Sequence, residues 1–337
     1  MVNKIKSYIY IILFIPITIF TQNSGDDSLL KQISGIEVEL DAPVETEENL
    51  YLNSVSFQSF YDILSPMGEW IQVSKEDVDE DLSDGDGQSY SLIADDEEFV
   101  FIWKPTAGTD WKPYMNGKWI YTNQGWLWKS TDSWGNATYN YGRWWNSKKY
   151  GWVWMPGYAW APAWVRWKVS DDHVGWVPLT PKAKWTSETG INKNNYKYED
   201  ADVNWVFVGK EGFINELNSS NITASSMNSE LVSKSQNITD IKVENDAIIN
   251  NGPDVADIEK RCGKKIDKKY LKFTRERNRF RMGEKDVTLS RENFTKYSTN
   301  LNSDKAKLDK PKKFKKSENV KKKLKKRLKH KRRIRGK

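Results

Sequence analysis

Few side chains in this sequence could carry out catalysis. His173 is the single histidine of the Trp-rich middle region, no GxSxG motif is present, and Cys262 has no histidine near it in sequence. Nucleophilic catalysis needs an adjacent base, and glycoside hydrolysis needs two opposed carboxyl groups. The candidates for such a pair are Asp110, Asp132, Asp171 and Asp172. Because these residues resemble ordinary turn residues, we expect a non-enzymatic protein without a cofactor, and a carbohydrate-active enzyme is the less favoured alternative.

Aromatic residues are the next candidates, because all 17 Trp lie within residues 70–205 and flat rings stack on sugar rings or bases. Indoles at every second position share one face of a strand, so Trp126 with Trp128 and Trp152 with Trp154 are predicted to be core residues. The adjacent Trp144 and Trp145 must point to opposite faces, so one of them faces outward unless both faces are covered. The residues expected to bind a ligand are Trp134, Tyr139, Tyr141, Arg143, Trp145 and Trp160.

An acidic stretch resembles a calcium loop in composition but not in spacing. If Asp86 and Gly87 occupy positions five and six of an EF-type loop, positions one and twelve fall on Leu82 and Ile93, which cannot bind a cation. We therefore expect no metal site, and residues 74–98 are predicted to form a solvated acidic loop. The acidic residues considered are Asp77, Asp79, Glu80, Asp81, Asp84 and Asp86.

A repeat in the middle region must position these aromatic residues. Gly117-Lys118-Trp119 and Gly125-Trp126-Leu127-Trp128 recur 25 or 26 residues later as Gly142-Arg143-Trp144 and Gly151-Trp152-Val153-Trp154, with degenerate copies on either side. Polar turn formers separate the two arms of each copy, which is typical of a β-hairpin. The sequence predicts a mainly β protein in which about four Trp-rich hairpins share a core, as a small barrel or a two-layer sheet.

The ordered motifs resemble an uncharacterised bacterial family of exported Trp-rich proteins, often found beside or fused to FecR-like domains. The resemblance covers residues 56–265 and includes the YxYGRW and GWxWxPGxxWxPAWV patterns. It implies a cell-envelope setting but no established activity. One departure is Asn140, where members commonly place His between two Tyr, so no role of that histidine is carried over. The segments that carry the resemblance are Trp111–Tyr114, Gly117–Trp119, Gly125–Trp128, Trp134–Gly135, Tyr139–Trp144, Gly151–Gly157, Trp160–Val165, Gly175–Leu179 and Asn251–Val255.

Charge is distributed unevenly along the chain. Residues 23–102 hold 21 acidic and 2 basic side chains, residues 103–250 hold 14 and 16, and residues 251–337 hold 11 and 33. Such a basic end is predicted to be disordered and to bind a polyanion, although a purely solubilising tail is the alternative. The residues expected to bind the polyanion are Lys321, Lys322, Lys323, Lys325, Lys326, Arg327, Arg332 and Arg333.

The first 22 residues are typical of an export signal, with Lys4 and Lys6 followed by an apolar run of 13 residues, Tyr8–Phe20. We therefore expect a periplasmic, outer-membrane-surface or secreted protein; an uncleaved membrane anchor is the alternative. The segments expected to follow are an acidic part (23–55), the Trp-rich β-domain (56–208), an Asn/Ser-rich linker (209–250) with a short hairpin, a small helical and extended region (251–304) and a disordered basic tail (305–337).

The favoured function is binding of a glycan or another cell-envelope component, such as an anionic polymer, by the aromatic β-domain, with the tail holding the protein on an anionic surface. Extracellular nucleic acid is a further candidate partner, peripheral contact with a membrane is expected, and the oligomeric state is left open. In the alternative, every indole is a core residue and the protein acts only through its charged ends. Exposure of Trp134, Tyr139, Tyr141 and Trp145 separates the two.

Overall fold

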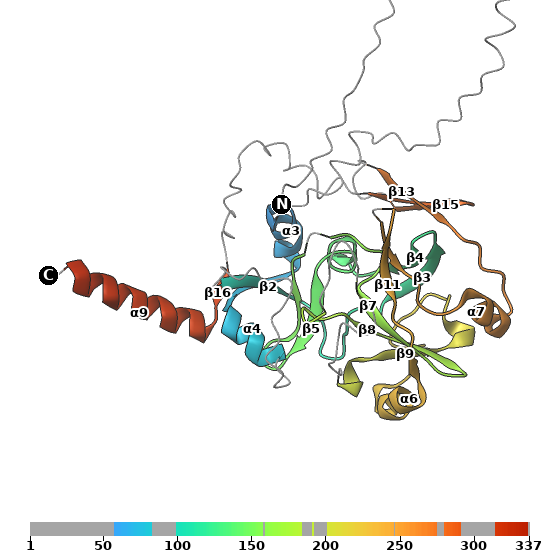
Figure 1. Ribbon diagram of the computed structural model, residues 1–337, viewed down its shortest axis with the longest axis horizontal. Helices are drawn as coiled ribbons and strands as arrows, with labels where there is room; N and C mark the ends of the chain where they lie inside the picture. Colours follow the sequence, from blue (N-terminus) through green and yellow to red (C-terminus); the bar gives the residue numbers. More distant parts are fainter. Residues whose placement is uncertain are drawn as a thin grey trace, which may run out of the picture. The chain divides into compact units, whose positions relative to one another are not determined.

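The computed structural model describes residues 57–82, 99–157, 159–183, 191, 201–245, 247–274, 280–290 and 314–335. The export signal and the acidic segment 23–55 lie outside the described residues and stay predictions. The described part is mainly β, as predicted, and its strands form several sheets (Figure 1). None of these sheets closes into a barrel within the described residues.

Each copy of the repeat forms an antiparallel hairpin, which confirms the predicted unit. The pairs are β1 with β2, β3 with β4, β5 with β6, and β7 with β8. The strands are β1 (Gly68–Ser74), β2 (Phe99–Pro105), β3 (Gly117–Thr122), β4 (Gly125–Ser130), β5 (Arg143–Ser147), β6 (Gly151–Met155), β7 (Val165–Val169) and β8 (His173–Pro178).

A pair of indoles lies directly across the two arms of every hairpin. All eight of these side chains are at most 2% exposed and belong to one core cluster. Aromatic rings of this size bury large areas and stabilise strand pairing, so the repeat supplies the centre of the core. The cross-strand pairs are Trp70 with Trp103, Trp119 with Trp128, Trp144 with Trp154, and Trp167 with Trp176.

The glycine two residues before the first indole makes room for the second one. At Gly142, where φ is +63°, an added Cβ would lie 2.6 Å from the Trp154 indole and 2.2 Å from the Met155 carbonyl oxygen. Gly117, where φ is +148°, has the same relation to Trp128, at 2.9 Å. The backbone conformation and the close approach together explain why the repeat places Gly here.

Two tyrosines connect the hairpin pairs. The Tyr139 ring lies 6.2 Å from Trp144 and 6.4 Å from Trp128, and Tyr114 lies 4.5 Å from Tyr139. The Tyr114 hydroxyl donates to the Tyr139 carbonyl oxygen at 2.8 Å and accepts from the Trp164 N–H at 3.1 Å. These tyrosines therefore join the hairpins into a single core.

Two helices cover the sheet that contains β1, β2, β6 and β5. Helix α3 (Phe57–Leu64) adds aromatic rings to the indole side, with Phe60 5.0 Å from Trp154. Helix α4 (Lys75–Leu82) buries Val78 and Leu82 on the opposite side with Trp145. The prediction of a solvated loop is therefore wrong for residues 75–82, while residues 83–98 lie outside the described residues.

Residues 209–250 are not a linker, because their strands complete the sheets. Strand β9 (Val206–Gly209), which pairs with β8, ends where this segment begins. Within the segment, β10 (Gln236–Asn237) pairs with β7. The predicted short hairpin is present as β11 (Ile241–Glu244) and β12 (Ala247–Asn250), and β12 continues onto β4. The segment is polar on average, which led to the prediction of a linker, but it contains a few strongly apolar residues. Three of them, Ile241, Ile248 and Ile249, are buried and hold β11 and β12 in the sheet. Helix α6 (Asn228–Lys234) packs Leu231 beside β9.

The predicted helical and extended region after residue 250 contains a helix, α7 (Val255–Cys262). Asp254 caps its first turn, and Gly263 ends it in the left-handed conformation with φ +69°. Ile258 is fully buried and Cys262 is half-buried beside the core. The sheet of β13 (Tyr270–Thr274), β15 (Asp286–Ser290) and β14 (Phe280–Met282) follows. The remaining short elements are α5 (Gly135–Thr138), η1 (Ser65–Met67), η2 (Asp202–Asn204), η3 (Lys210–Gly212) and η4 (Ser225–Met227).

The basic end also differs from its prediction. Residues 314–335 form a short strand, β16 (Lys315–Lys316), and a helix, α9 (Glu318–Arg335), where disorder was expected. Strand β16 adds to the edge of the sheet beside β1, so contacts outside the tail supply the order that its composition lacks. Among the helices in the described ranges, none is long and apolar enough to cross a membrane.

Candidate functional site

The root of the basic helix is attached to the edge of the first sheet. Lys315 and Lys316 pair in parallel with Ile71 and Gln72, and the Ser317 N–H donates to the Gln72 carbonyl oxygen at 2.9 Å. Phe314 packs against Phe101 with ring centroids 5.1 Å apart. An exposed sheet edge offers unpaired backbone groups, and β16 satisfies those of β1 over two residues.

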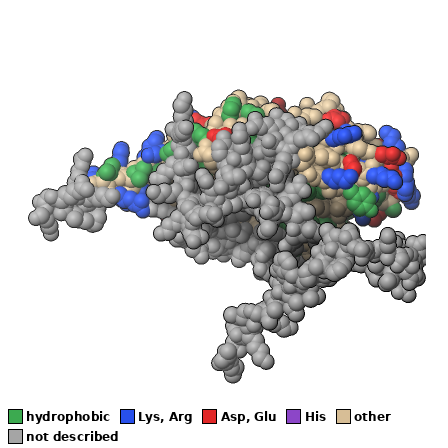
Figure 2. Space-filling view, turned by 90° about the horizontal axis from the view of Figure 1, so that it is seen from above, with side chains coloured by type: hydrophobic (Ala, Val, Ile, Leu, Met, Phe, Trp, Pro, Cys, Tyr) green, Lys and Arg blue, Asp and Glu red, His purple; other side chains and the backbone are tan. Residues whose placement is uncertain are grey.

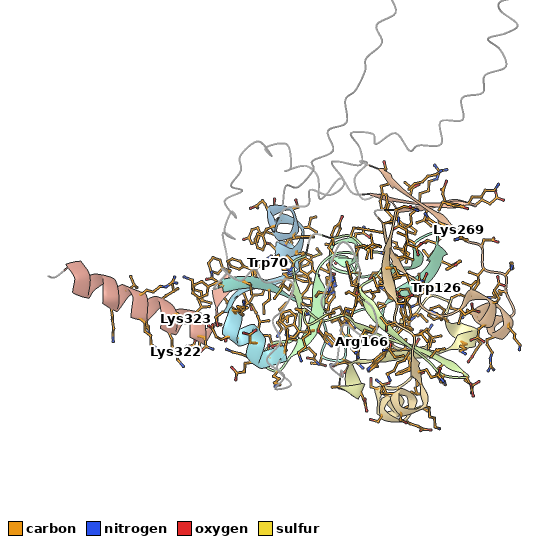
Figure 3. All side chains as sticks on the ribbon, in the orientation of Figure 1. Trp70, Trp126, Arg166, Lys269, Lys322 and Lys323 are labelled. Carbon is orange, nitrogen blue, oxygen red and sulfur yellow. The ribbon has the colours of Figure 1, made fainter. Side chains whose placement is uncertain are left out.

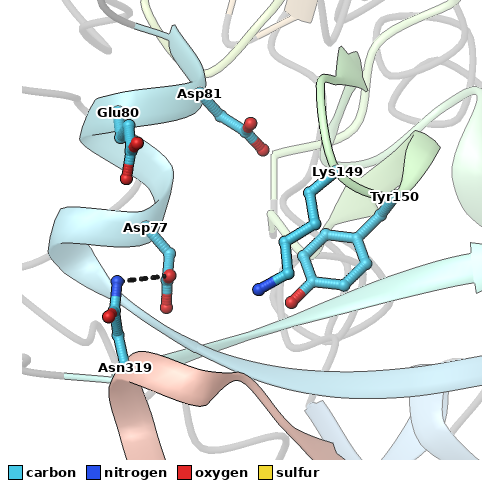
Figure 4. Close-up of a pocket in the computed structure, with 6 residues that line it drawn as sticks. All are labelled: Asp77, Glu80, Asp81, Lys149, Tyr150 and Asn319. Atoms are coloured by element: carbon cyan, nitrogen blue, oxygen red, sulfur yellow. Dashed lines mark hydrogen bonds between the residues drawn. The ribbon is translucent and has the colours of Figure 1, made fainter.

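The Asp77 carboxylate connects α4 to α9. It accepts hydrogen bonds from the Ser74 N–H at 2.9 Å and the Ser74 hydroxyl at 3.0 Å, which cap α4. It also accepts from the Ser317 hydroxyl at 2.6 Å and the Asn319 amide at 2.9 Å (Figure 4). Ser317 in turn caps α9, because its hydroxyl accepts from the Val320 N–H at 3.2 Å. One carboxylate therefore holds the first turns of both helices.

Two ion pairs support this attachment. The Lys323 ammonium lies 2.6 Å from the Glu76 carboxylate, and the Lys315 ammonium lies 2.6 Å from that of Glu69. We call Glu69, Glu76 and Asp77 the acidic seat. The Val320 side chain is fully buried against the protein at this place. Exposed ion pairs stabilise weakly, so the buried Val320 and the Asp77 hydrogen bonds are the main determinants of docking.

Beyond its first turn, α9 turns a row of cations to solvent. Helical geometry of about 100° per residue places positions 322, 325, 326 and 329 on the face opposite Val320. All four side chains are exposed, and no ion pair involves them within the described residues. Figure 3 shows Lys322 beside Lys323 at the root of the helix. We call Lys322, Lys325, Lys326 and Lys329 the cationic stripe.

The other predicted polyanion-binding residues have different surroundings. Lys321 and Arg327 are exposed, but Lys321 pairs with Glu318 at 2.6 Å and Arg327 lies 5.7 Å over the Phe99 ring. Lys323 is partly buried by its pair with Glu76. Arg332 and Arg333 belong to α9, but their side chains lie outside the described residues.

A pocket of about 220 Å³ lies where α4, the β5–β6 turn and α9 meet (Figure 4). Burial opposes ionisation of Asp77, but the hydrogen bonds from Ser317, Ser74 and Asn319 outweigh it and lower its pKa below 3.8. Partial burial likewise opposes the charge of Lys149, yet Tyr150, Asp77 and Glu318 raise its pKa. The pocket thus keeps both charges at neutral pH. Its lining residues are Asp77, Glu80, Asp81, Lys149, Tyr150 and Asn319.

The lowered pKa of Asp77 determines how the attachment of α9 depends on pH. Because the pKa in the folded protein is lower than in the unfolded chain, ionised Asp77 stabilises docking throughout the range above about pH 3.9. This contribution is lost as the pH falls through the lower folded-state pKa. The α9 root is therefore firmly attached at neutral pH.

Replacing Asp77 with Asn is expected to loosen α9 at neutral pH. The amide NH2 cannot accept the hydrogen bonds that the carboxylate accepts from Ser74 and Ser317, and bonds to a charged group contribute about 1.5–3 kcal/mol. Amide hydrogens of Val320 and Lys321, which bond to Ser317, should exchange roughly 10–100 times faster by this figure. Glu80→Gln, on the exposed side of the same helix, is the control, and equal exchange in both variants would contradict the role of Asp77.

The predicted aromatic ligand site does not form, because most of its residues are core residues. Tyr139, Tyr141, Arg143 and Trp145 are at most 2% exposed. The Arg143 guanidinium lies 3.5 Å over the Trp164 ring, and Trp145 is covered by α4 on the second face of its sheet. Both faces are therefore covered, which is the condition under which neither Trp144 nor Trp145 points outward.

The two remaining aromatic candidates are half-buried. Trp134 packs edge-on against Trp103 and Trp111, each with ring centroids 5.7 Å away. Trp160 packs against Phe273 at 5.1 Å. Since each ring already contacts aromatic neighbours, the six candidates do not make a common platform.

The carboxylates considered for glycoside hydrolysis are not brought together by any contact in the described residues. Asp132 accepts hydrogen bonds from the Tyr139 hydroxyl, the Trp111 indole and the Asn116 amide, and burial raises its pKa. Asp172 pairs instead with Arg261 at 3.2 Å. Asp132 therefore serves to fix Tyr139 in the core, where burial and the neighbouring carboxylate raise the tyrosine pKa well above 10.0.

Sequence reasoning missed the acidic seat, although its local signals are present. Ser74 and Asp77 have the spacing of a capping box, and Ser317 followed by Glu318 is typical of a helix start. These patterns mark where two helices begin. They do not show that the second helix begins on the first one.

Comparison with known proteins gives one match. The sequence profile described as "Family of unknown function (DUF6600)" matches residues 86–183, which include most of the hairpin repeat. No curated protein matches the chain significantly, and neither does any solved structure. The match therefore identifies an uncharacterised domain in the Trp-rich middle of the chain.

Proposed function

We propose that this protein is a non-enzymatic interaction protein that binds an anionic polymer or surface through the cationic stripe of α9. The observation that carries the proposal is the asymmetry of that helix. Its first turn is fixed by Asp77 and the buried Val320, while the four lysines of the cationic stripe face solvent without ionic partners in the described part of the chain. A fixed row of positive charge attracts polyanions and releases their counterions on binding.

In this proposal the Trp-rich hairpins act as a scaffold. Their paired indoles fill one core. The aromatic residues that the sequence predicted to bind a ligand are buried or pack against other rings. This burial supports the alternative in which the protein acts through its charged ends. It gives no support to glycan binding by Trp134, Tyr139, Tyr141, Arg143, Trp145 and Trp160.

The proposed setting is the bacterial cell envelope. The typical export signal at residues 1–22 and the YxYGRW and GWxWxPGxxWxPAWV patterns support membership in the exported Trp-rich proteins that accompany FecR-like domains. Envelope polymers that carry phosphate or carboxylate groups are the polyanions available there. The acidic seat holds the helix at its root and leaves the cationic stripe accessible to them.

The test is a lysine-acetylation footprint of the full chain with and without polygalacturonate at low salt. A bound polymer should protect Lys322, Lys325, Lys326 and Lys329 about 5-fold or more, because reagent access falls where ammonium groups are ion-paired. The exposed Lys104 and Lys148 are internal controls and should react equally under both conditions. Equal labelling of the cationic stripe with and without polymer, under conditions in which polymer is bound, would overturn the proposal.

A further inference from the structure

The three-stranded sheet β13–β15–β14 is held rigidly on the β3–β4 hairpin. Its inner side chains, including the fully buried Val287, pack on Ile120 and Leu127. The Lys269 N–H donates to the Tyr121 carbonyl oxygen at 3.0 Å, and the Asn123 N–H donates to the Lys269 carbonyl oxygen at 2.9 Å (Figure 3). Because one face and one end are fixed, the other face is presented in a defined arrangement.

That other face carries a row of polar and charged side chains in register. Lys272 of β13 and Arg281 of β14 both pair with Thr288 of the central strand. Strand spacing places the two cations about 10 Å apart across the sheet. Tyr270 shares the face with Lys272 by period two and is 57% exposed, and Asp286 lies opposite it. We call Tyr270, Lys272, Arg281, Asp286 and Thr288 the outer sheet face.

Lys272, Arg281, Asp286 and Thr288 of the outer sheet face line a depression of about 450 Å³, to which Gly283, Glu284 and Lys285 of the β14–β15 turn also contribute. Lys272 pairs with Asp286 at 2.6 Å, whereas Arg281 and Lys285 have no carboxylate partner within the described residues. Figure 2 shows Lys and Arg side chains among Asp and Glu side chains on the right of the molecule, the side on which Figure 1 places both this sheet and α7. The depression thus holds two cations that have no carboxylate partner in this part of the chain, beside hydrogen-bond acceptors.

We infer that the outer sheet face is a second binding surface, and that its ligand is an acidic polysaccharide. Arg281 and Lys285 would pair with the acidic groups of the polymer, and the exposed Tyr270 ring suits the apolar face of a sugar. Asp286, Glu284 and Thr288 would accept hydrogen bonds from sugar hydroxyls. DNA lacks those hydroxyls, so the acceptors favour a glycan over DNA.

This inference goes beyond the proposed function, because it uses a different element and a more specific ligand. Two surfaces on one chain that contact the same polymer bind it more tightly than either alone, since the second contact is intramolecular. The outer sheet face is mixed in charge and contains an aromatic ring, so it supplies selectivity. The cationic stripe supplies attraction that is independent of the sugar.

The test uses the full chain with Lys322, Lys325, Lys326 and Lys329 changed to Gln, so that only the sheet contributes. This background should still bind polygalacturonate at about 50 mM salt, and adding Arg281→Gln and Lys285→Gln should weaken binding about 10-fold, with a salt slope lower by about two. The matched control adds Lys234→Gln and Lys242→Gln to the same background. These two exposed lysines lie outside the outer sheet face, so the affinity should change less than about 2-fold. All four sheet and control positions face solvent, so the fold should be retained, as checked by thermal unfolding.

A further variant separates a sugar site from simple charge attraction. Tyr270→Ala in the same background should weaken polygalacturonate binding about 3–10-fold while leaving the salt slope unchanged, because stacking involves no counterion. The inference is overturned if the background does not bind polygalacturonate, if Arg281→Gln with Lys285→Gln has no effect, or if an oligo-dT strand binds more tightly than the polysaccharide. Whether the cationic stripe binds the polymer is tested separately, by comparing the affinity of the native chain with that of the variant in which its four lysines are changed to Gln.

Discussion

Replacing Trp154 with Ala is expected to lower the free energy of unfolding by about 3–5 kcal/mol, the range for deleting a fully buried indole. Its side chain is 0% exposed, and its N–H donates to the Tyr141 carbonyl oxygen at 2.9 Å. The ring packs on Phe60 at 5.0 Å and on Trp70 at 6.4 Å, so the change leaves a cavity that two elements line. Denaturant titration monitored by far-UV circular dichroism measures the loss.

Trp152 provides the matched control, because it is the same residue type on the same face of the same strand. It is only half-buried at the border of the core, so Trp152→Ala should cost about 1–2 kcal/mol. A loss below about 1 kcal/mol for Trp154→Ala, or equal losses for both variants, would contradict the assignment of the paired indoles as the centre of the core.

Changing Lys322, Lys325, Lys326 and Lys329 to Gln is expected to weaken binding of an anionic polymer about 100-fold at 50 mM salt. Each lysine that pairs with an anionic group of the polymer contributes about one unit to the slope of log affinity against log salt concentration. Removing four such contacts therefore removes most of the electrostatic attraction of α9. Substitution is a cleaner test than truncation. A chain that ends at Asp309 also loses the Phe314 packing and the buried Val320, which should cost about 1–3 kcal/mol of stability.

The hairpin repeat could be predicted because it depends on local rules. The spacing of Gly117 and Gly142 locates the first arms, and strict alternation identifies Trp126, Trp128 and Trp154 as core residues. Helix α7 was predictable for the same reason, since Pro253 and Gly263 mark its two ends. In each case the residues that decide the structure are neighbours in sequence.

The aromatic site could not be judged from sequence, because burial depends on what covers a face. Alternation shows that Trp144 and Trp145 point to opposite sides of β5, but only the packing of α4 shows that both sides are covered. Tyr139 lies outside the alternation, and its burial depends on its position between Trp128 and Trp144. These contacts join segments that are separated in sequence and carry no periodic signal.

The attachment of the basic end to the sheet could not be predicted from its average composition. A charge count over residues 305–337 predicts repulsion and disorder. The attachment of α9 depends instead on single residues such as Val320 and Asp77. A buried valine and a carboxylate with four donors outweigh the repulsion at the root of α9. Beyond the root nothing in the described residues neutralises the cationic stripe, and there the charge pattern indicated its accessibility correctly.

We propose that the cationic stripe, and not the Trp-rich core, binds the anionic partner. The most direct measurement is the affinity of the full chain for polygalacturonate at about 50 mM and 200 mM salt, for the native protein and the four-Gln variant. Lys104, Lys148, Lys234 and Lys242 changed to Gln make the charge-matched control. We expect steep weakening with salt for the native and control chains, and a slope smaller by about three to four units for the four-Gln variant. Identical affinities and slopes for all three chains would contradict the claim.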